Sequence, residues 1–446
     1  MNKKNIISIA LFFMTTAPTW SQKQWSLQDC INYAMQNNIT LQQARLAIQS
    51  AEEDVKGSRA ALLPSLSASS NQSVGYRPWQ NSGVTTVTNG QVNTKVNKSY
   101  YNGSYGLNAQ WTVWNGNRNH NTLKQNKLTA EQSALDAQTS ANSVQEQIAQ
   151  LYVQLLYLKE AVKVSEQSLE TSKKNEERGL QMQEVGKLSK ADVAQLSAQR
   201  ASDEYNIVEA RANISKYMLQ LKQLLELDGT TEFDIITPET NDEQALSPIP
   251  ALQSVYEQAL ALRPEIQSGQ KAVQSSELSV KMAKAGYLPT LNMTAGLGTS
   301  TNSLSNNTWG QQLKTNFDAS AGLSLSIPIF DQRQTKTSVR KARIQQQRAQ
   351  LDLLDRQKQL YQTIEGFWLD AETNQQKFKS AQATEQSELQ SYELLQEQFS
   401  LGLKNIVELM TGKDKLLSAQ QNKLQSKYQT ILAQQMLTFY QGQEIK

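Results

Sequence analysis

The sequence has 446 residues, of which 38% are hydrophobic, and a formal net charge of +3. The length would allow two or three ordinary domains, but this small apolar fraction suits long helices with narrow apolar stripes better than thick cores. Charge is balanced and no basic patch with interleaved aromatic residues stands out, which argues against nucleic acid as the main partner.

The N-terminus has the pattern of a secretory signal peptide over residues 1–21. Lys3 and Lys4 precede an apolar run, and small residues stand before a cut ahead of Gln22. A membrane anchor is the weaker alternative, because the run is shorter than the roughly 20 residues that a spanning helix needs. No later stretch is long enough either, so we expect no transmembrane helix.

The chain contains one cysteine, Cys30, and one histidine, His120. A single cysteine cannot form an intrachain disulfide, and Asp29 just before it argues against lipidation. One histidine and one cysteine cannot make a zinc site or a Cys/His nucleophile pair, and we find no phosphate-binding glycine loop. We therefore expect no enzyme activity, no cofactor and no metal site.

Two short strings nearly repeat about half a chain apart. They are AALLPSL at 60–66 and AGYLPTL at 285–291. In each, a helical pattern runs into a proline, Pro64 or Pro289, and continues as an alternating strand pattern. The pair predicts a fold built by duplication, with one helix-to-strand junction in each half.

The first repeat, residues 22–227, is predicted to hold helices and two strands. In chain order we expect a helix over 27–63, strands over 65–76 and 104–114 with a polar loop over 79–97 between them, a helix over 118–178, a turn, and a helix over 189–227. Residues 118–178 contain neither proline nor glycine, so that helix would be roughly 90 Å long at 1.5 Å per residue.

Residues 228–250 contain three prolines and are predicted to connect the halves. The second repeat, residues 251–446, has the same order. We expect a helix over 251–287 broken near Pro264, strands over 289–299 and 316–328 with a polar loop over 301–315 between them, a helix over 332–399, a turn at Gly402, and a helix over 405–440. Helices of this length need neighbours in water, which predicts coiled-coil-like packing.

The strand over 104–114 has one apolar and one polar face. Tyr105, Leu107 and Trp111 alternate with Ser104, Asn108 and Gln110, as lipid outside and water inside would require. Four strands cannot close a barrel, and an open edge cannot sit in lipid, so we expect oligomerisation through the strands. Three copies would give twelve strands and a lumen, which the polar faces favour over the packed interior that eight strands would give.

Aromatic residues near the strand ends fit the girdles found at membrane interfaces. We expect one set toward the outer rim and another where strands meet helices: Tyr76, Trp79, Tyr100, Tyr101, Trp309 and Phe317, and then Trp114, Tyr287 and Phe330.

This order of elements resembles the TolC family of outer-membrane efflux ducts over essentially the whole mature chain. The match rests on the two proline junctions, on the strand-to-helix exits at 114–116 and 330–332, and on the turns at Gly186 and Gly402. The resemblance implies an α+β fold, in which a long antiparallel α-helical barrel in the periplasm joins a twelve-stranded β-barrel in the outer membrane of a Gram-negative bacterium.

The resemblance also implies a function and partners. The expected protein is a homotrimeric, passive duct of a tripartite efflux or type I secretion system, which exports small molecules or polypeptides. Its two helical tips would dock to a periplasmic adaptor protein that works with an inner-membrane pump. The tip residues that match are Val185, Gly186, Leu188, Ser189, Leu401, Gly402 and Leu403.

The resemblance further implies a periplasmic gate. In the family, an aspartate after the first tip pairs with an arginine after the second, and the matching residues are Asp192 and Lys404. Lysine lacks the bidentate fork of arginine, so we expect a weaker latch. Glu408 matches the first of two constricting carboxylates, and Thr411 stands where the second would be. The alternative for these charges is an ordinary solvated helix end.

A second class of function is a structural or adhesive coiled-coil protein of the cell surface. It would explain the helices and the polar composition, but not four strands of matched length with a polar face. Protease added to intact cells would cut such external helices and spare periplasmic ones.

Overall fold

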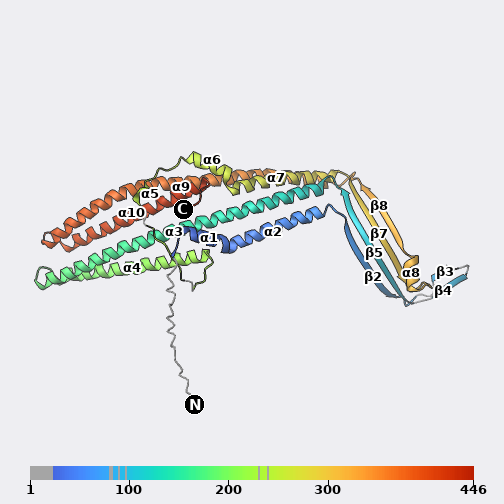
Figure 1. Ribbon diagram of the computed structural model, residues 1–446, viewed down its shortest axis with the longest axis horizontal. Helices are drawn as coiled ribbons and strands as arrows, with labels where there is room; N and C mark the ends of the chain where they lie inside the picture. Colours follow the sequence, from blue (N-terminus) through green and yellow to red (C-terminus); the bar gives the residue numbers. More distant parts are fainter. Residues whose placement is uncertain are drawn as a thin grey trace, which may run out of the picture. The chain divides into compact units, whose positions relative to one another are not determined.

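The computed structural model describes residues 24–79, 84–88, 91–95, 98–229, 232–238 and 241–445. The signal peptide predicted over residues 1–21 lies outside these residues. The chain, drawn in Figure 1, forms two compact units. Unit 1 holds the segment up to Ile39, Ala141–Val255 and the segment from Ile364 on, and unit 2 holds Thr40–Ser140 and Tyr256–Thr363. Each unit therefore takes segments from both sequence repeats.

Unit 2 contains a four-stranded antiparallel sheet with the order β2-β5-β7-β8. The strands are β2 (Ser65–Tyr76), β5 (Ser99–Trp114), β7 (Thr290–Asn302) and β8 (Asp318–Ser326). The central pairing of β5 with β7 joins the two repeats. Among the described residues, the outer edges of β2 and β8 have no strand partner.

The structure corrects the loop predicted over 79–97. This segment contains β3 (Val84–Thr88) and β4 (Gln91–Lys95), which pair as an antiparallel hairpin. β-Branched valine and threonine favour strands, which explains the hairpin. β5 also starts at Ser99, earlier than the predicted 104.

The loop predicted over 301–315 is corrected too. β7 continues to Asn302, and a short helix, α8 (Trp309–Thr315), follows it. Thr308 caps this helix by accepting a hydrogen bond from the backbone N–H of Gln311, whose side chain accepts one from the Thr308 N–H.

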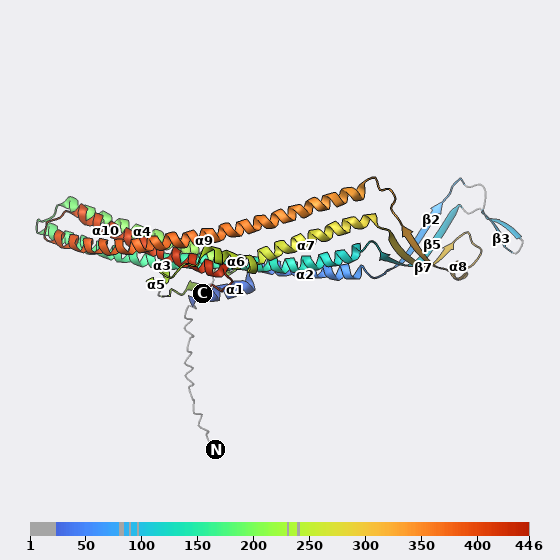
Figure 2. The same cartoon turned by 90° about the horizontal axis from the view of Figure 1, so that it is seen from above.

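Four helices form two hairpins, whose tips lie in unit 1. They are α3 (Arg118–Glu184) with α4 (Lys190–Leu224), and α9 (Gln334–Ser400) with α10 (Ile406–Tyr440). Figures 1 and 2 show α4 returning along α3 and α10 returning along α9. The first part of α3, up to Ser140, and the first part of α9, up to Thr363, belong to unit 2. α3 continues beyond the predicted end at 178, because Gly179 is accommodated within the helix.

The helix predicted over 27–63 is broken into α1 (Leu27–Asn37) and α2 (Ile39–Ala60). Asn38 is extended between them, with φ −61° and ψ 128°. Its side-chain Nδ2 donates to the Leu224 carbonyl at 2.9 Å, so the break meets the end of α4. In the second repeat, α6 (Leu252–Leu262) and α7 (Pro264–Lys284) are separated at Arg263, with Pro264 at the first turn of α7.

The connector between the repeats is tied to α3. It contains β6 (Asp234–Ile235), which pairs in parallel with β1 (Gln24–Trp25), and α5 (Asp242–Ala245); residues 230, 231, 239 and 240 lie outside the described part. The Tyr152 hydroxyl has one proton to share between two carbonyl oxygens, that of Ile236 at 2.8 Å and that of Trp25 at 3.2 Å.

The core of unit 1 is a narrow apolar seam between helices. Ile148 and Leu155 on α3, Phe378 on α9, and Leu409 and Met436 on α10 are at most 1% exposed. Within the described part of the chain, none of the helices combines the length and apolarity required to cross a bilayer.

Candidate functional site

The two faces of the sheet in unit 2 differ in polarity, as the strand pattern predicts. The register sets Leu107 opposite Ala68 and Leu297, and one position along it sets Asn108 opposite Ser67 and Gly296. Residues directly opposite each other in antiparallel strands share a face. The apolar face carries Leu66, Ala68, Leu107, Ala109, Trp111, Met293, Ala295, Leu297, Ala321, Leu323 and Leu325.

The apolar face is exposed in the single chain. Leu66, Leu323 and Leu325 are 75%, 71% and 61% exposed. The opposite face carries serine, asparagine, threonine and glycine. Lipid on one side and water on the other satisfy both faces, whereas a packed globular core would satisfy only one.

The predicted junctions at Pro64 and Pro289 have the same geometry. The backbone N–H of Leu63 donates to the Ala60 carbonyl at 2.9 Å, and that of Leu288 donates to the Ala285 carbonyl at 3.0 Å. Each proline comes one residue before a strand, β2 or β7. Proline has no backbone N–H, so it cannot continue the helix and fits the position where the strand begins. The helix-to-strand turns therefore occur twice by the same means.

The strand-to-helix exits are also equivalent. Gly116 and Asn117 have φ of 66° and 63°, and Gln332 and Arg333 have φ of 51° and 69°. Two reasons favour glycine at 116. Its φ is positive, and a Cβ there would lie only 3.0 Å from the Leu288 side chain. The non-glycine residues at 332 and 333 hold a backbone conformation that costs free energy.

The tips of the two hairpins are built alike. Gly186 has φ 75° and Gly402 has φ 76°, the left-handed conformation that ends a helix. The next helix then starts with a capping box. At the first tip Ser189 and Asp192 form it, with Asp192 Oδ2 accepting from the Ser189 hydroxyl at 2.7 Å.

The second tip has its capping box at Asn405 and Glu408. Asn405 Oδ1 accepts from the Glu408 N–H at 2.9 Å, and Glu408 Oε2 accepts from the Asn405 N–H at 3.2 Å. Lys404 Nζ lies 2.6 Å from Glu408 Oε1. The hydrogen bond from Lys404, together with the bond to the Asn405 backbone, holds the pKa of Glu408 below its usual range.

The structure does not bring the predicted latch residues together. Among the described residues, Asp192 bonds within its own turn and Lys404 pairs with Glu408 on its own hairpin. A capping box needs an acid or amide at this position, so capping alone explains Asp192 and Glu408.

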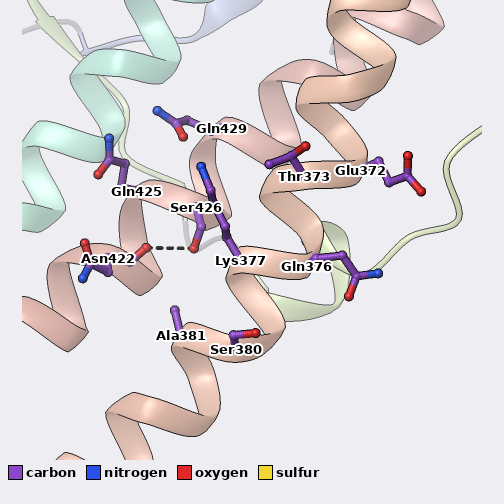
Figure 3. A pocket seen from close by; sticks show the side chains of 10 residues that line it. All are labelled: Glu372, Thr373, Gln376, Lys377, Ser380, Ala381, Asn422, Gln425, Ser426 and Gln429. Atoms are coloured by element: carbon purple, nitrogen blue, oxygen red, sulfur yellow. Dashed lines mark hydrogen bonds between the residues drawn. The ribbon is translucent and has the colours of Figure 1, made fainter.

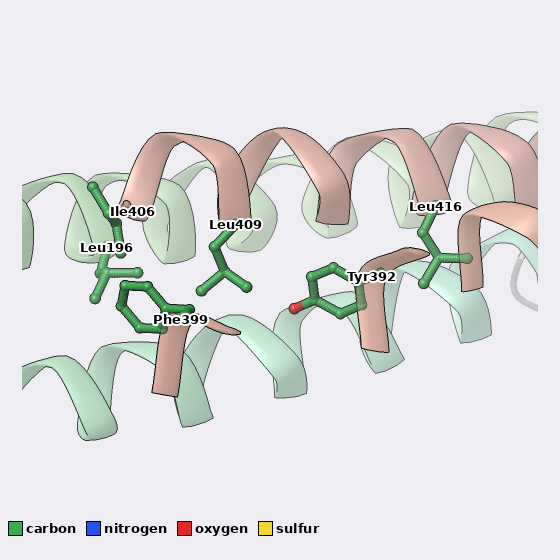
Figure 4. Packing of buried hydrophobic residues seen from close by; sticks show 6 residues of the cluster. All are labelled: Leu196, Tyr392, Phe399, Ile406, Leu409 and Leu416. Atoms are coloured by element: carbon green, nitrogen blue, oxygen red, sulfur yellow. The ribbon is translucent and has the colours of Figure 1, made fainter. Parts of the chain in front are cut away.

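Apolar side chains project from both tips. Val185, Leu401 and Leu403 are 69%, 73% and 71% exposed. Leu188, in contrast, packs against a buried cluster drawn in Figure 4: Leu196, Tyr392, Phe399, Ile406, Leu409 and Leu416. The tips thus combine a buried apolar base with exposed apolar ends.

Helix α4 carries two stripes of heptad spacing. One is buried against its neighbours and includes Val193, Leu196 and Ile207. The other is exposed and rich in small residues: Ala194, Ala198, Ala201, Tyr205, Val208, Ala212, Ser215 and Leu219. Alternating three- and four-residue spacing is the pattern of a coiled-coil seam, so α4 presents a second, exposed face of that kind.

Sequence reasoning missed a buried charged cluster between the hairpins. Lys413 of α10 forms an ion pair with Asp203 of α4, and both residues are 4% exposed. Ser172 of α3 donates to Asp203 Oδ2 at 2.5 Å and accepts from Lys413 Nζ at 2.8 Å. A signal was present: Lys413 continues the apolar spacing of Ile406, Leu409 and Leu416.

One groove of unit 1 is lined mainly by polar residues. The groove between α9 and α10 in Figure 3 has a volume of about 800 Å³ and is lined by Glu372, Thr373, Gln376, Lys377, Ser380, Ala381, Asn422, Gln425, Ser426 and Gln429. In the described part of the chain, no three histidine, cysteine, aspartate or glutamate residues are grouped to hold a metal ion.

A sheet with one lipid-compatible and one water-compatible face, joined by repeated junctions to long helical hairpins, defines an outer-membrane protein of the α+β class. The model of the outer membrane efflux protein family matches residues 30–226 and 255–443, and the chain belongs to this family. It is therefore an outer-membrane protein with a periplasmic helical domain, related to TolC.

Individual relatives are distant. The chain is 24% identical over 260 residues to the alkaline protease secretion protein AprF of Pseudomonas aeruginosa, a match that covers 58% of this chain and about half (53%) of AprF. It is 23% identical to the outer membrane efflux protein BepC of Brucella suis, covering 76% of this chain and 68% of BepC.

The fold is also found in solved structures. The outer membrane protein VceC of Vibrio cholerae has a TM-score of 0.77 at 16% identity, covering 94% of this chain and 97% of VceC. At this identity the likeness establishes the fold and nothing finer.

Proposed function

We propose that the protein is the passive outer-membrane duct of a tripartite efflux or type I secretion system and works as a homotrimer. The observation that carries the proposal is the open four-stranded sheet with one polar and one exposed apolar face. Its free edges at β2 and β8 cannot stay unpaired in lipid, and a second and third copy can pair with them. The exposed stripe of α4 offers the helices the same kind of neighbour.

The tips are the proposed docking sites for a periplasmic adaptor, which would connect the duct to an inner-membrane pump. The residues are those predicted from the sequence, and the exposure of Val185, Leu401 and Leu403 supports their role. Asp192, Lys404 and Glu408 remain the proposed gate at the tip. AprF is named for protease secretion and BepC for efflux, so both polypeptides and small molecules are candidate cargo.

Single-channel recording tests this function. Purified protein should run as a detergent-stable trimer and conduct ions across a planar lipid bilayer. Asp192→Ala or Lys404→Ala should raise the conductance if the tip holds the inner end shut, and unchanged conductance in both would remove these residues from the gate.

A monomeric product without conductance would contradict the duct. Cleavage of the helices by protease added outside intact cells would instead favour an adhesive surface protein.

A further inference from the structure

The cluster of Asp203, Lys413 and Ser172 lies inside a coiled-coil seam. On α10, Ile406, Leu409, Lys413 and Leu416 follow one another at three- and four-residue spacing. On α4, Leu196, Asp203 and Ile207 occupy the corresponding stripe. Lysine and aspartate thus stand where apolar residues pack best. Such a buried ion pair is less stabilising than apolar packing, and its best-attested use is to fix the register of helices or to act as a switch.

The ion pair joins the two hairpins. Asp203 and Ser172 belong to the α3–α4 hairpin, and Lys413 belongs to the α9–α10 hairpin. Two other ion pairs of these helices act inside one hairpin: Arg200 with Glu176 at 2.7 Å in the first, and Lys423 with Glu385 at 2.8 Å in the second. Breaking the Lys413–Asp203 pair is therefore required for the hairpins to separate at this level.

Further polar contacts surround the pair. Gln199 Nε2 lies 3.2 Å from both Asp203 Oδ1 and Asp414 Oδ1, which connects α4 with α10 a second time. Asn175 of α3 donates to the Tyr392 hydroxyl of α9 at 3.3 Å. Burial and the nearby Asp203 carboxylate raise the pKa of Asp414, although the Lys413 charge opposes this rise.

The apolar cluster of Figure 4 flanks this layer. Leu196, Phe399, Ile406 and Leu409, from α4, α9 and α10, lie on its tip side, and Leu416 follows Lys413 along α10 on the other side. An apolar contact loses its whole benefit when water enters. A separated ion pair regains hydration, so a charged layer can part and reform reversibly.

We propose that Asp203, Lys413 and Ser172 form an interhairpin lock, deeper than the tip, whose strength sets how often the periplasmic end opens. The lock rests on the proposed duct function. It differs from the proposed tip gate, because among the described residues Asp192 and Lys404 bond within their own hairpins, whereas Lys413 pairs with Asp203 across the boundary.

The test compares single and double variants of the full-length protein. Lys413→Met and Asp203→Leu each leave one buried charge unpaired, so the open-state occupancy in planar bilayers should rise at least about tenfold. The double variant Asp203→Leu/Lys413→Met completes an apolar seam and should open less often than wild type. Arg200→Met, which removes an ion pair within one hairpin, is the matched control and should behave as wild type.

Hydrogen exchange of the purified protein gives a readout that does not need conductance. Amides around residues 196–210 and 406–420 should exchange faster in the single variants and slower in the double variant. If the wild-type protein does not conduct, the proposed duct function is contradicted, and the hydrogen-exchange comparison still tests the lock. If single variants that fold match wild type in exchange, or the double variant opens as readily as the singles, the lock is overturned.

Discussion

Asp192 and Glu408 occupy the same position in two equivalent turns, the third residue of a helix whose cap is Ser189 or Asn405. Their resemblance to gate residues is compatible with this role, because a capping carboxylate at a helix start is favoured by the helix dipole. Asp192 and Glu408 therefore each cap a helix, and a role in the proposed gate would be additional to this capping. By contrast, Asp203 and Lys413 have no such local role.

The carboxylate of Asp242, in the connector, should make the stability of the fold depend on pH. It lies 2.9 Å from Lys427 and 3.5 Å from Lys423. Burial raises its pKa, but the two lysines outweigh burial and hold the pKa below its usual value. A depressed carboxyl pKa adds stability above the unfolded value of about 3.9, and this stability is lost as pH falls through the folded pKa.

We therefore expect Asp242→Asn to lower the free energy of unfolding by about 1 kcal/mol at pH 7, with the difference from wild type shrinking on acidification. Denaturant unfolding at several pH values measures it. Glu209→Gln, at an exposed carboxylate of α4, is the control. A difference that grows as pH falls would contradict the ion-pair account.

At the scale of elements, the exposed stripe of α4 is the helical surface that supports the proposed trimer most clearly. Tyr205 and Val208 are 69% and 67% exposed in a stripe of heptad spacing. Val208→Lys should weaken the trimer without altering helix content, because a charge would enter a packed seam. The trimer fraction in detergent measures this, with Glu209→Lys as the control beside the stripe; equal trimer fractions would rule the stripe out as an interface.

Much of the element order could be read from the sequence. The long helices follow from stretches almost free of glycine and proline, and the strands follow from period-two alternation. The break at Asn38 could not be read, because it depends on a contact with Leu224, which is remote in sequence. The short helix α8 has a capping box at Thr308 and Gln311. A capping pattern alone is a weak signal when the helix that follows is so short.

The site was predictable in the same uneven way. Pro64, Pro289 and the tip glycines have local signatures, since a proline or a positive φ is dictated by the chain itself. The Lys413–Asp203 pair could not be found, because pairing helices from different repeats needs the tertiary register. Its one signal was a lysine at an apolar position.

At the scale of the whole molecule, duplication does not produce two domains. Both compact units combine segments of both repeats, and the sheet of unit 2 pairs β5 of the first repeat with β7 of the second. The proposed trimeric ring would supply neighbours to the sheet edges, the apolar sheet face and the α4 stripe, which lack them within the described residues.

Electron cryomicroscopy of the purified protein in lipid nanodiscs tests the central claim most directly. We predict three copies around one water-filled lumen, with β8 of each copy paired to β2 of the next in a twelve-stranded barrel, the polar sheet faces inward and the apolar faces toward lipid. A particle with unpaired sheet edges, or with the apolar faces turned inward, would contradict the account.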